Sequence, residues 1–203
     1  MPSSLPRILL VRHGETDWAR EGRHTGVTDA PLNPTGEASA RLLGRRFAGS
    51  QFGQVWSSPR QRAIRTAELA GRGPGLVVDP DLQEWNYGRF EGLTTREIRD
   101  QWAHWMVFRD GAPDGESPGD VAARADRLVG RLRAVTSDTL VFSHGHFLRA
   151  LAARWLGLPI AAGAHFILAP AAVSILGYEH GNREEPALIR WNDHGHAPEV
   201  AKD

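Results

Sequence analysis

The sequence of 203 residues contains no cysteine, which excludes disulfide bridges and any metal site built on cysteine ligands. It also lacks an excess of either charge, because 24 basic residues balance 24 acidic ones and the pI is near 7.2. This balance argues against a nucleic-acid-binding stripe or a polybasic membrane patch. Any cluster of arginines in this chain therefore needs a local explanation.

Long apolar runs are missing as well. No run reaches membrane-spanning length, and the opening MPSSLPRILLVRHGE has an apolar core that is too short for a signal peptide. We therefore expect a soluble cytoplasmic protein. With 41% hydrophobic residues and no linker, the chain suits a single domain over residues 1–203, with loose ends at 1–6 and 193–203.

Two short stretches share one pattern, ILLVRHGET at 8–16 and TLVFSHGHF at 139–147. Each is an apolar run, one polar residue, His-Gly, and a segment that can begin a helix. An apolar run closed by glycine is typical of a buried strand that ends in a loop. Open α/β sheets place their ligand sites at the carboxyl ends of strands, so neighbouring strands would bring His13 and His144 together.

The remaining chain alternates between helical and strand patterns. Helices are expected to begin near Thr35, Ser58, Thr94, Ser117 and His146. Further strands are expected at 54–57 and 76–78, and a hairpin at 172–178 and 187–191. This order predicts an α/β fold, a single three-layer α/β/α domain with a mostly parallel sheet and an antiparallel edge.

Arginines gather where one of these helices should begin, in SSPRQRAIRTAE at 57–68. Arg12 and Arg62 can make bidentate contacts to the oxygens of a phosphate. The amides that open the helices after His13, Ser58 and Gly145 can add fixed partial positive charge. Together these groups predict a pocket for a phosphate.

Three side chains could carry out chemistry on that phosphate. His13 can present one ring nitrogen as a nucleophile, provided that the other donates to a backbone carbonyl and holds the tautomer. His144 is expected as a second, cationic imidazole that stabilises charge on the transferred group. Glu84 lies among apolar and aromatic residues, which disfavour ionisation of a carboxyl and suit a proton donor.

Each motif also has a purely structural interpretation. His144 could be a hydrogen-bonded core histidine, and Arg60, Arg62 and Arg65 could form a solvated helix face. Short motifs match by accident. The combination, with both histidines at strand ends, is hard to explain by structure alone and favours a site.

The chain carries five landmarks in order between residues 8 and 156: LVRHGETDW, HTGVTDAPLNPTG, SSPRQRAIRTAE, LQEWNYGRFEG and SHGHF. They resemble the histidine phosphatase superfamily, in particular its phosphoglycerate-mutase-like branch. The resemblance implies a phosphohistidine on His13, with Glu84 as proton donor and later as the base that activates water. It assigns substrate binding to Arg12, Thr25, Gly26, Arg62, His144 and Gly145. It implies no metal and no cofactor.

The family contains both phosphatases and mutases, and three features here are closer to the phosphatases. Ala19 stands where the mutases usually have Asn, EWNYGRFEG resembles the phosphatase form, and the region 96–119 looks shorter than the mutase insertion. RDGAPDGES is similar to phosphatases that act on sugar phosphates. We therefore predict a metal-independent phosphatase of small phosphomonoesters. A mutase and a non-catalytic phospholigand-binding domain remain as alternatives.

Substrate choice is expected to depend on the stretch after Glu84. The aromatic residues there could form a wall of the pocket: Trp85, Tyr87, Trp102, Trp105 and Phe108. Trp102 and Trp105 are better explained as the buried face of the following helix. Arg109 could meet a second anionic group, and His24 and His146 are left without a role. His180, His194 and His196 lack a carboxylate cluster, so no zinc site is predicted. The expected partner is a small phosphorylated metabolite, neither nucleic acid nor membrane, and a homodimer is left open.

Overall fold

The computed structural model describes residues 5–196 and contains one six-stranded sheet in the order β3-β2-β4-β1-β5-β6. The strands are β1 (Ile8–Arg12), β2 (Gln54–Ser57), β3 (Val77–Val78), β4 (Thr139–Ser143), β5 (Val173–Tyr178) and β6 (Pro186–Asp193). β3, β2, β4 and β1 are parallel, whereas β5 and β6 pair antiparallel. This confirms the predicted mostly parallel sheet with an antiparallel hairpin at its edge.

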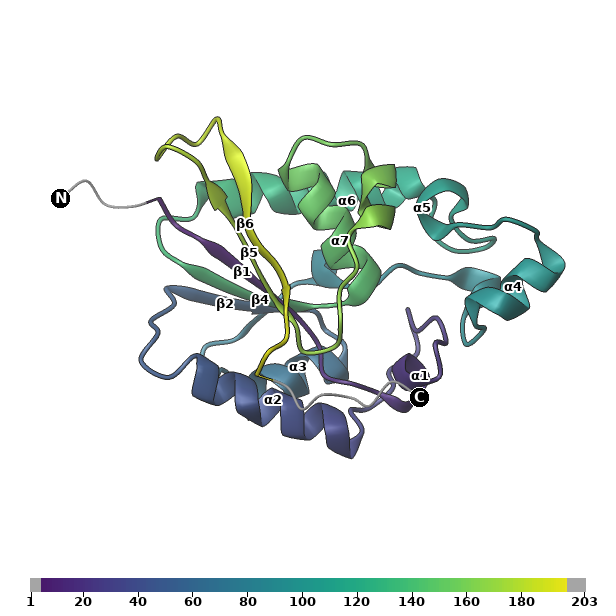
Figure 1. Cartoon of the computed structure of the whole chain (residues 1–203), viewed down its shortest axis with the longest axis horizontal. Helices are drawn as coiled ribbons and strands as arrows, with labels where there is room; N and C mark the ends of the chain where they lie inside the picture. Colours follow the sequence, from purple (N-terminus) through teal and green to yellow (C-terminus); the bar gives the residue numbers. More distant parts are fainter. Residues whose placement is uncertain (1–4, 197–203) are drawn as a thin grey trace.

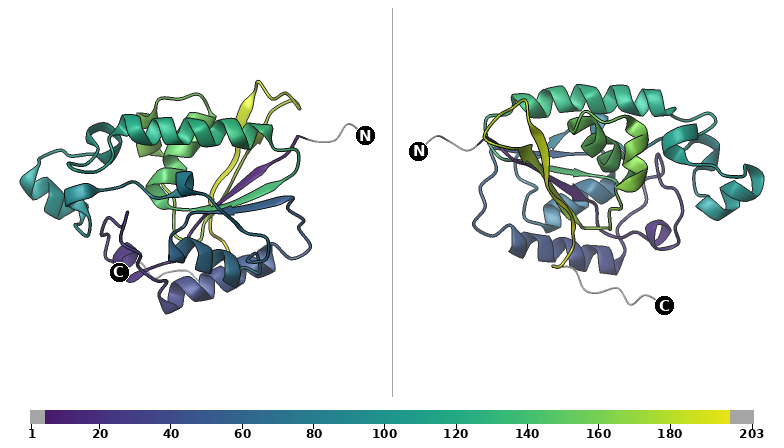
Figure 2. Two further views of the ribbon diagram at one scale, coloured as in Figure 1. Left: turned by 180° about the vertical axis from the view of Figure 1, so that it is seen from behind. Right: turned by 45° about the horizontal axis from the view of Figure 1, so that its top comes forward.

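Helices cover both faces of the sheet (Figures 1 and 2). α2 (Pro34–Arg46) and α3 (Gln61–Leu69) lie on one face, and α6 (Pro118–Ala134) and α7 (Gly145–Trp155) lie on the other. The short helices are α1 (Asp17–Arg20), α4 (Thr95–Gln101) and α5 (Val107–Asp110), with 3₁₀ turns at Pro80–Leu82, Gly88–Phe90 and Ile160–His165. The three-layer α/β/α architecture is therefore confirmed. No helix within residues 5–196 is long and apolar enough to span a bilayer.

The strand β4 is buried along its whole length. Val141 packs in the cluster beneath α6 and α7, whereas Leu140 and Phe142 pack in the cluster beneath α2 and α3. Side chains alternate between the faces of a strand, so a strand covered on both faces needs a continuous apolar run. The continuous apolar run before His144 is therefore explained by the burial of β4 on both faces of the sheet.

The pairing of β1 with β4 decides where the two histidines lie. In this parallel pair, Arg12 stands opposite Ser143, and the amide of His13 donates to the Ser143 carbonyl at 2.9 Å. His13 and His144 therefore leave the sheet at the same level and at the same edge. The two strands are neighbours, as the shared pattern requires.

Capping residues predict four of the helix starts, and the structure confirms two of the four predicted N-caps. Thr94 and Ser117 cap α4 and α6, each in a reciprocal capping box. The helix α2 is capped by Asn33 instead of Thr35, and α3 begins only at Gln61. Ser58 is not the N-cap of α3, which is Arg60; the Ser58 hydroxyl accepts from the Arg60 amide at 3.2 Å and lies 2.7 Å from Nε2 of His144.

The ends of the chain were expected to be loose. Residues 1–4 and 197–203 lie outside the described residues. Asp193, by contrast, belongs to β6 and forms an ion pair with Arg46 at 2.6 Å. The expectation of a loose end from residue 193 onward is therefore wrong at its first residue.

Candidate active site

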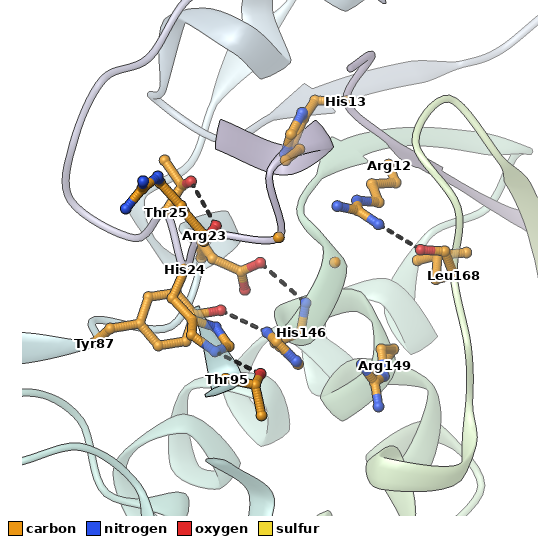
Figure 3. Close-up of a pocket in the computed structure, with 14 residues that line it drawn as sticks. Arg12, His13, Arg23, His24, Thr25, Tyr87, Thr95, His146, Arg149 and Leu168 are labelled. Atoms are coloured by element: carbon orange, nitrogen blue, oxygen red, sulfur yellow. Dashed lines mark hydrogen bonds between the residues drawn. The ribbon is translucent and has the colours of Figure 1, made fainter. Parts of the chain in front are cut away.

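A cavity of about 250 Å³ lies where β1 and β4 end, with Arg12 at the end of β1 and Gly145 at the start of α7 in its wall (Figure 3). Its lining comes from several distant segments: Arg12, His13, Ala19, Gly22, Arg23, His24, Thr25, Glu84, Tyr87, Thr95, Gly145, His146, Arg149 and Leu168. Five of the predicted site residues, His13, Arg12, Glu84, Thr25 and Gly145, are among them. Its position matches the strand-end site that open α/β sheets favour.

His13 is buried at the floor of this cavity, with 5% of its surface exposed. Its Nδ1 lies 2.7 Å from the carbonyl oxygen of Gly14. A carbonyl can only accept, so Nδ1 must carry the proton and donate, which leaves Nε2 with its lone pair. Burial, followed by the charges of Arg62 and Arg12, lowers the pKa of His13 well below 6.5 and keeps the ring neutral.

His144 lies beneath His13, with the two ring centroids 5.1 Å apart and an edge-on geometry. Arg62 donates from Nε to Nδ1 of His144 at 3.1 Å, and Nε2 of His144 lies 2.7 Å from the Ser58 hydroxyl. Because a guanidinium only donates, Nδ1 has no proton and the ring is neutral. Burial and Arg62 lower the pKa of His144 well below 6.5. The expected cationic state of His144 is therefore wrong for this structure.

Arg62 is completely buried and does not reach the cavity surface. Its terminal nitrogens donate to the carbonyl oxygens of Thr28 at 2.8 Å and Thr25 at 3.0 Å. Arg62 thus ties the loop that carries Thr25 to α3 and to His144. Gly26 belongs to the same loop but is outside the lining, and a Cβ on it would come 2.2 Å from the Trp85 carbonyl oxygen.

Arg12 reaches the cavity from the last position of β1. One terminal nitrogen donates to the Leu168 carbonyl at 2.5 Å, and its buried Nε has no hydrogen-bond partner in the described part of the chain. A Cβ on Gly145 would lie 3.3 Å from the Arg12 guanidinium carbon. The glycine therefore lets the first turn of α7 pack directly on the guanidinium.

Glu84 has surroundings different from those expected. Its carboxylate accepts from the backbone amides of Trp85 at 2.9 Å, His146 at 3.0 Å and Phe147 at 2.8 Å. Two of these amides belong to the first turn of α7, where the helix dipole also favours negative charge. The expected purely apolar environment is wrong, because the fold places the N-terminus of α7 against this carboxylate.

The outer wall of the cavity is polar and aromatic (Figure 3). The Tyr87 hydroxyl and Nδ1 of His146 are 2.6 Å apart, and Nε2 of His24 lies 3.2 Å from the Thr95 hydroxyl. Burial lowers the pKa of His24 to about 4. These side chains offer hydroxyl and imidazole groups to whatever is attached to the phosphate.

Most of the expected aromatic wall lies one layer further back. Trp85, Trp105 and Phe108 are core residues, Trp102 is 43% exposed, and of the five aromatics only Tyr87 lines the cavity. The expectation for Arg109 is also wrong, because its guanidinium pairs with the adjacent Asp110 at 2.7 Å outside the cavity.

Several cavity residues were not predicted from the sequence, among them Arg23, Thr95, Arg149 and Leu168. Helical spacing would have revealed Arg149, which follows His146 by three residues on α7 and so shares its face. Arg23, Thr95 and Leu168 come from segments whose approach to the site depends on tertiary packing. Within residues 5–196, no group of three or more His, Asp or Glu side chains is placed to hold a metal.

Comparison with known proteins places this geometry in a family. Residues 8–194 match the model of the histidine phosphatase superfamily (branch 1). An acid phosphatase of Mycobacterium tuberculosis is 44% identical over 186 residues, covering 90% of this chain and 91% of the relative. A sedoheptulose 1,7-bisphosphatase of Saccharomyces cerevisiae is 32% identical, covering 93% of each chain.

Mutases occur among the relatives too. A protein of Photorhabdus laumondii named as a probable phosphoglycerate mutase is 33% identical, covering 86% of each chain. A solved structure from Mycobacterium tuberculosis superposes with a TM-score of 0.87 at 42% identity, covering 93% of this chain and 97% of that one. The chain, with its paired histidines at the ends of β1 and β4, belongs to the histidine phosphatase superfamily, branch 1.

Proposed function

We propose that this protein is a metal-independent phosphatase that hydrolyses small phosphomonoesters, sugar phosphates among them, through a phosphohistidine on His13. The observation that carries the proposal is the state of the His13 ring. Its Nδ1 is fixed by the Gly14 carbonyl at 2.7 Å, and its pKa is lowered by burial and by two guanidiniums. A neutral imidazole with a free Nε2 in a cationic pocket is suited to attack phosphorus.

The phosphate would lie between His13, Arg12 and the first turn of α7. Arg12 keeps donors that the described residues leave unused, including a buried Nε. Arg62 and His144 support this place from below, because Arg62 fixes both the His144 ring and the loop that carries Thr25. Their role in the proposal is to hold positive charge and geometry near the transferred group.

In the first step, the lone pair of Nε2 forms a bond to phosphorus while the bond between phosphorus and the ester oxygen breaks. Glu84 gives its proton to the departing alkoxide, so the alcohol leaves neutral. In the second step, Glu84 takes a proton from a water molecule as its oxygen attacks the phosphorus. The bond to Nε2 breaks, inorganic phosphate leaves, and His13 and protonated Glu84 are restored.

Glu84 must carry a proton for the first step, and the bound substrate can help to keep it there. A phosphate dianion bound beside the carboxylate repels it, and repulsion between like charges favours protonation of the carboxyl. Binding of the dianion would thereby prepare the acid that the leaving group needs, and this predicts faster turnover at acidic to neutral pH.

The size and polarity of the cavity favour a small polyhydroxylated ester. About 250 Å³ is at the small end for ligand sites, which disfavours a phosphoprotein. The hydroxyl groups of Thr25, Tyr87 and Thr95 and the ring of His24 line it and can bond sugar hydroxyls. A relative that acts on a sugar bisphosphate supports the same substrate class.

Hydrolysis is favoured over transfer because the acid phosphatase relative is 44% identical, whereas the mutase-named relative is 33% identical. The two activities differ only in what receives the phosphate from His13. Measurement of inorganic phosphate and of isomerised ester together, with and without a bisphosphorylated primer, separates them. Isomerisation that outruns phosphate release in the presence of the primer would replace the proposal by the mutase alternative.

The test of the proposal combines turnover with trapping of the intermediate. Phosphate release should resist EDTA and disappear in His13→Ala, whereas His180→Ala, in the exposed turn between β5 and β6, should retain it. With an ester that carries a labelled phosphate, the label should be lost from the protein when turnover is quenched with acid. It should remain on His13 when turnover is quenched with alkali. A label on another side chain, or activity that depends on an added divalent metal, would refute the proposal.

A further inference from the structure

We propose that Arg124 is a positioning residue for Glu84, and that it holds the Glu84 carboxyl in place for both of its proton transfers. Arg124 belongs to α6, is outside the lining of the cavity, and bonds the main chain of Glu84. The inference rests on the proposed function, in which Glu84 is the acid of the first step and the base of the second.

The segment that carries Glu84 has no regular structure of its own to fix it. Residues 83–87 belong to no helix and no strand, and they follow a 3₁₀ turn at Pro80–Leu82. Glu84 is nevertheless buried, and the carbonyl groups of a buried main chain need hydrogen-bond partners. The Ser143 hydroxyl supplies one of them, because it donates to the Leu82 carbonyl at 2.7 Å. The position of Glu84 therefore depends on side chains that bond the carbonyls around it.

Arg124 supplies most of these bonds. It is buried, and each of its five N–H groups donates to a neighbour. Nη1 donates to the carbonyl oxygens of Asp81 at 2.9 Å and Gln83 at 2.6 Å. Nη2 makes a longer bond of 3.4 Å to the carbonyl oxygen of Glu84 itself. A single guanidinium therefore holds the main chain up to and including the residue that carries the carboxyl.

The other bonds of Arg124 hold Glu116, which in turn bonds the chain beyond Glu84. Nε and Nη2 lie 3.0 and 2.9 Å from the two oxygens of the Glu116 carboxylate, in a bidentate ion pair. One of these oxygens accepts from the Asn86 amide at 2.8 Å, and the Glu116 carbonyl accepts from Nε1 of Trp85 at 2.8 Å. The ion pair therefore fixes the chain both before and after Glu84.

Arg124 also contacts the helix end that binds the carboxylate. Its guanidinium carbon lies 4.3 Å from the centroid of the Phe147 ring, over the ring face. The amide of Phe147 donates to the Glu84 carboxylate at 2.8 Å. One side chain thus connects the main chain of Glu84 to the first turn of α7, which receives its carboxylate.

A buried ion pair could instead serve stability alone, and the two roles differ in which substrates are affected. An alkoxide must be protonated as it departs, whereas p-nitrophenolate departs with the electron pair of the broken bond and needs no proton. Displacement of Glu84 therefore slows the first step with an alkyl ester and spares it with p-nitrophenyl phosphate. The second step needs Glu84 as a base with either ester. A variant that is only less stable loses both reactions in proportion to its folded fraction.

The experiment compares Arg124→Met with the wild type on glycerol 3-phosphate and p-nitrophenyl phosphate, using the full-length protein. On glycerol 3-phosphate, kcat should fall about 10²-fold while KM changes less than about threefold, as expected when an acid is misplaced by about 1 Å. With p-nitrophenyl phosphate, the variant should release p-nitrophenolate in a rapid burst of about one per site and then turn over slowly. The burst amplitude counts the folded sites, so misfolding lowers the amplitude and leaves the burst rate unchanged.

The matched control is Arg127→Met, in the same helix. Arg127 is 61% exposed and pairs with the Asp81 side chain at 2.7 Å, so its loss leaves the carbonyl bonds of Arg124 in place. This variant should retain wild-type kinetics on both esters. Arg124→Lys keeps a charge over Phe147 without the planar fork, and it should fall between the wild type and Arg124→Met. If Arg124→Met yields no folded protein, the same comparison is made with Arg124→Lys.

Equal losses in the burst rate and in kcat on glycerol 3-phosphate would overturn the proposal, and so would wild-type kinetics on both esters. Failure of the proposed function looks different, since hydrolysis would then be absent from the wild type or would survive in His13→Ala. In that case amide hydrogen exchange decides, because it needs no turnover. The amides of Trp85 and Phe147, which bond the Glu84 carboxylate, should exchange faster in Arg124→Met while those of β4 do not. Unchanged exchange at these two amides would refute the positioning role.

Discussion

The cavity has an inner end and an outer wall that are built in different ways. At the inner end, His13 and His144 follow strands in fixed register, and Arg62 is bonded on every side. In the outer wall, Tyr87 and His24 come from loops and Thr95 from the short helix α4, and single side-chain hydrogen bonds join Tyr87 to His146 of α7 and His24 to Thr95. The rigid end suits a reaction shared by the family, and the adaptable wall suits substrate choice.

The sharpest test of this comparison removes one arginine from each region. Arg12→Ala should lower kcat/KM by about 10²–10³-fold on any phosphomonoester, because a fixed donor to the transferred group is lost. Arg23→Ala should change kcat/KM by less than about tenfold, since Glu21 already neutralises Arg23 and it is partly exposed. Steady-state kinetics on one neutral ester measures both effects.

Unfolding curves provide the control for this pair, because a variant that is merely unfolded would imitate a loss of activity. If the two arginines proved equally important for a neutral ester, the division of the cavity into a reacting end and a selecting wall would be wrong. A selective effect of Arg23→Ala on one class of ester would instead sharpen the division.

The inner end could be predicted from the sequence because its signals are local. An apolar run that ends in His-Gly predicts a buried strand with a histidine at its end, and the structure places both such strands side by side. What the local pattern could not provide is the protonation of the second ring. The neutral state of His144 depends on Arg62 and Ser58, which reach it only through the tertiary fold.

The outer wall was largely beyond prediction for the same reason. The aromatic stretch after Glu84 gave Tyr87 correctly, but Trp85 and Phe108 became core, since nothing local tells which side of an irregular segment meets the cavity. Trp105 is buried as its helical spacing predicted, whereas Trp102 is 43% exposed. Thr95 and Leu168 join the site from elements with no motif of their own. Arg149 is the exception, because it shares a helix face with His146.

The two regions share a response to acid that the buried histidines create. The pKa of His24 is about 4 in the folded protein and near 6.5 when unfolded, so the unfolded chain binds the proton first as the pH falls. The stabilising effect of the neutral ring is therefore complete above pH 6.5 and is lost as the pH falls towards 4. From pH 7 to pH 5, His24 should cost about 2 kcal/mol of the free energy of unfolding.

Urea unfolding at pH 7 and pH 5 checks this expectation. The wild type should lose stability between the two pH values, and His24→Gln should lose about 2 kcal/mol less. The exposed His165 provides the control, since His165→Gln should show the wild-type difference. An unchanged pH dependence in His24→Gln would show that His24 takes no part in the response to acid and that the other buried histidines, His13, His144 and His146, account for all of it.

The smallest effect concerns the single bond that joins Tyr87 to His146 at 2.6 Å. Tyr87→Phe keeps the buried ring, which packs 4.8 Å from His24, and removes only the hydroxyl. The free energy of unfolding should fall by about 1 kcal/mol, the usual net contribution of one hydrogen bond, because Nδ1 of His146 is left without a partner.

If Tyr87 belongs to the selecting wall, KM of the Tyr87→Phe variant for a sugar phosphate should rise a fewfold while kcat stays within about twofold. A large fall in kcat with unchanged KM would place Tyr87 at the reacting end, because it would mean that the hydroxyl acts on the transition state through Glu84 or Arg12 and not on the bound sugar.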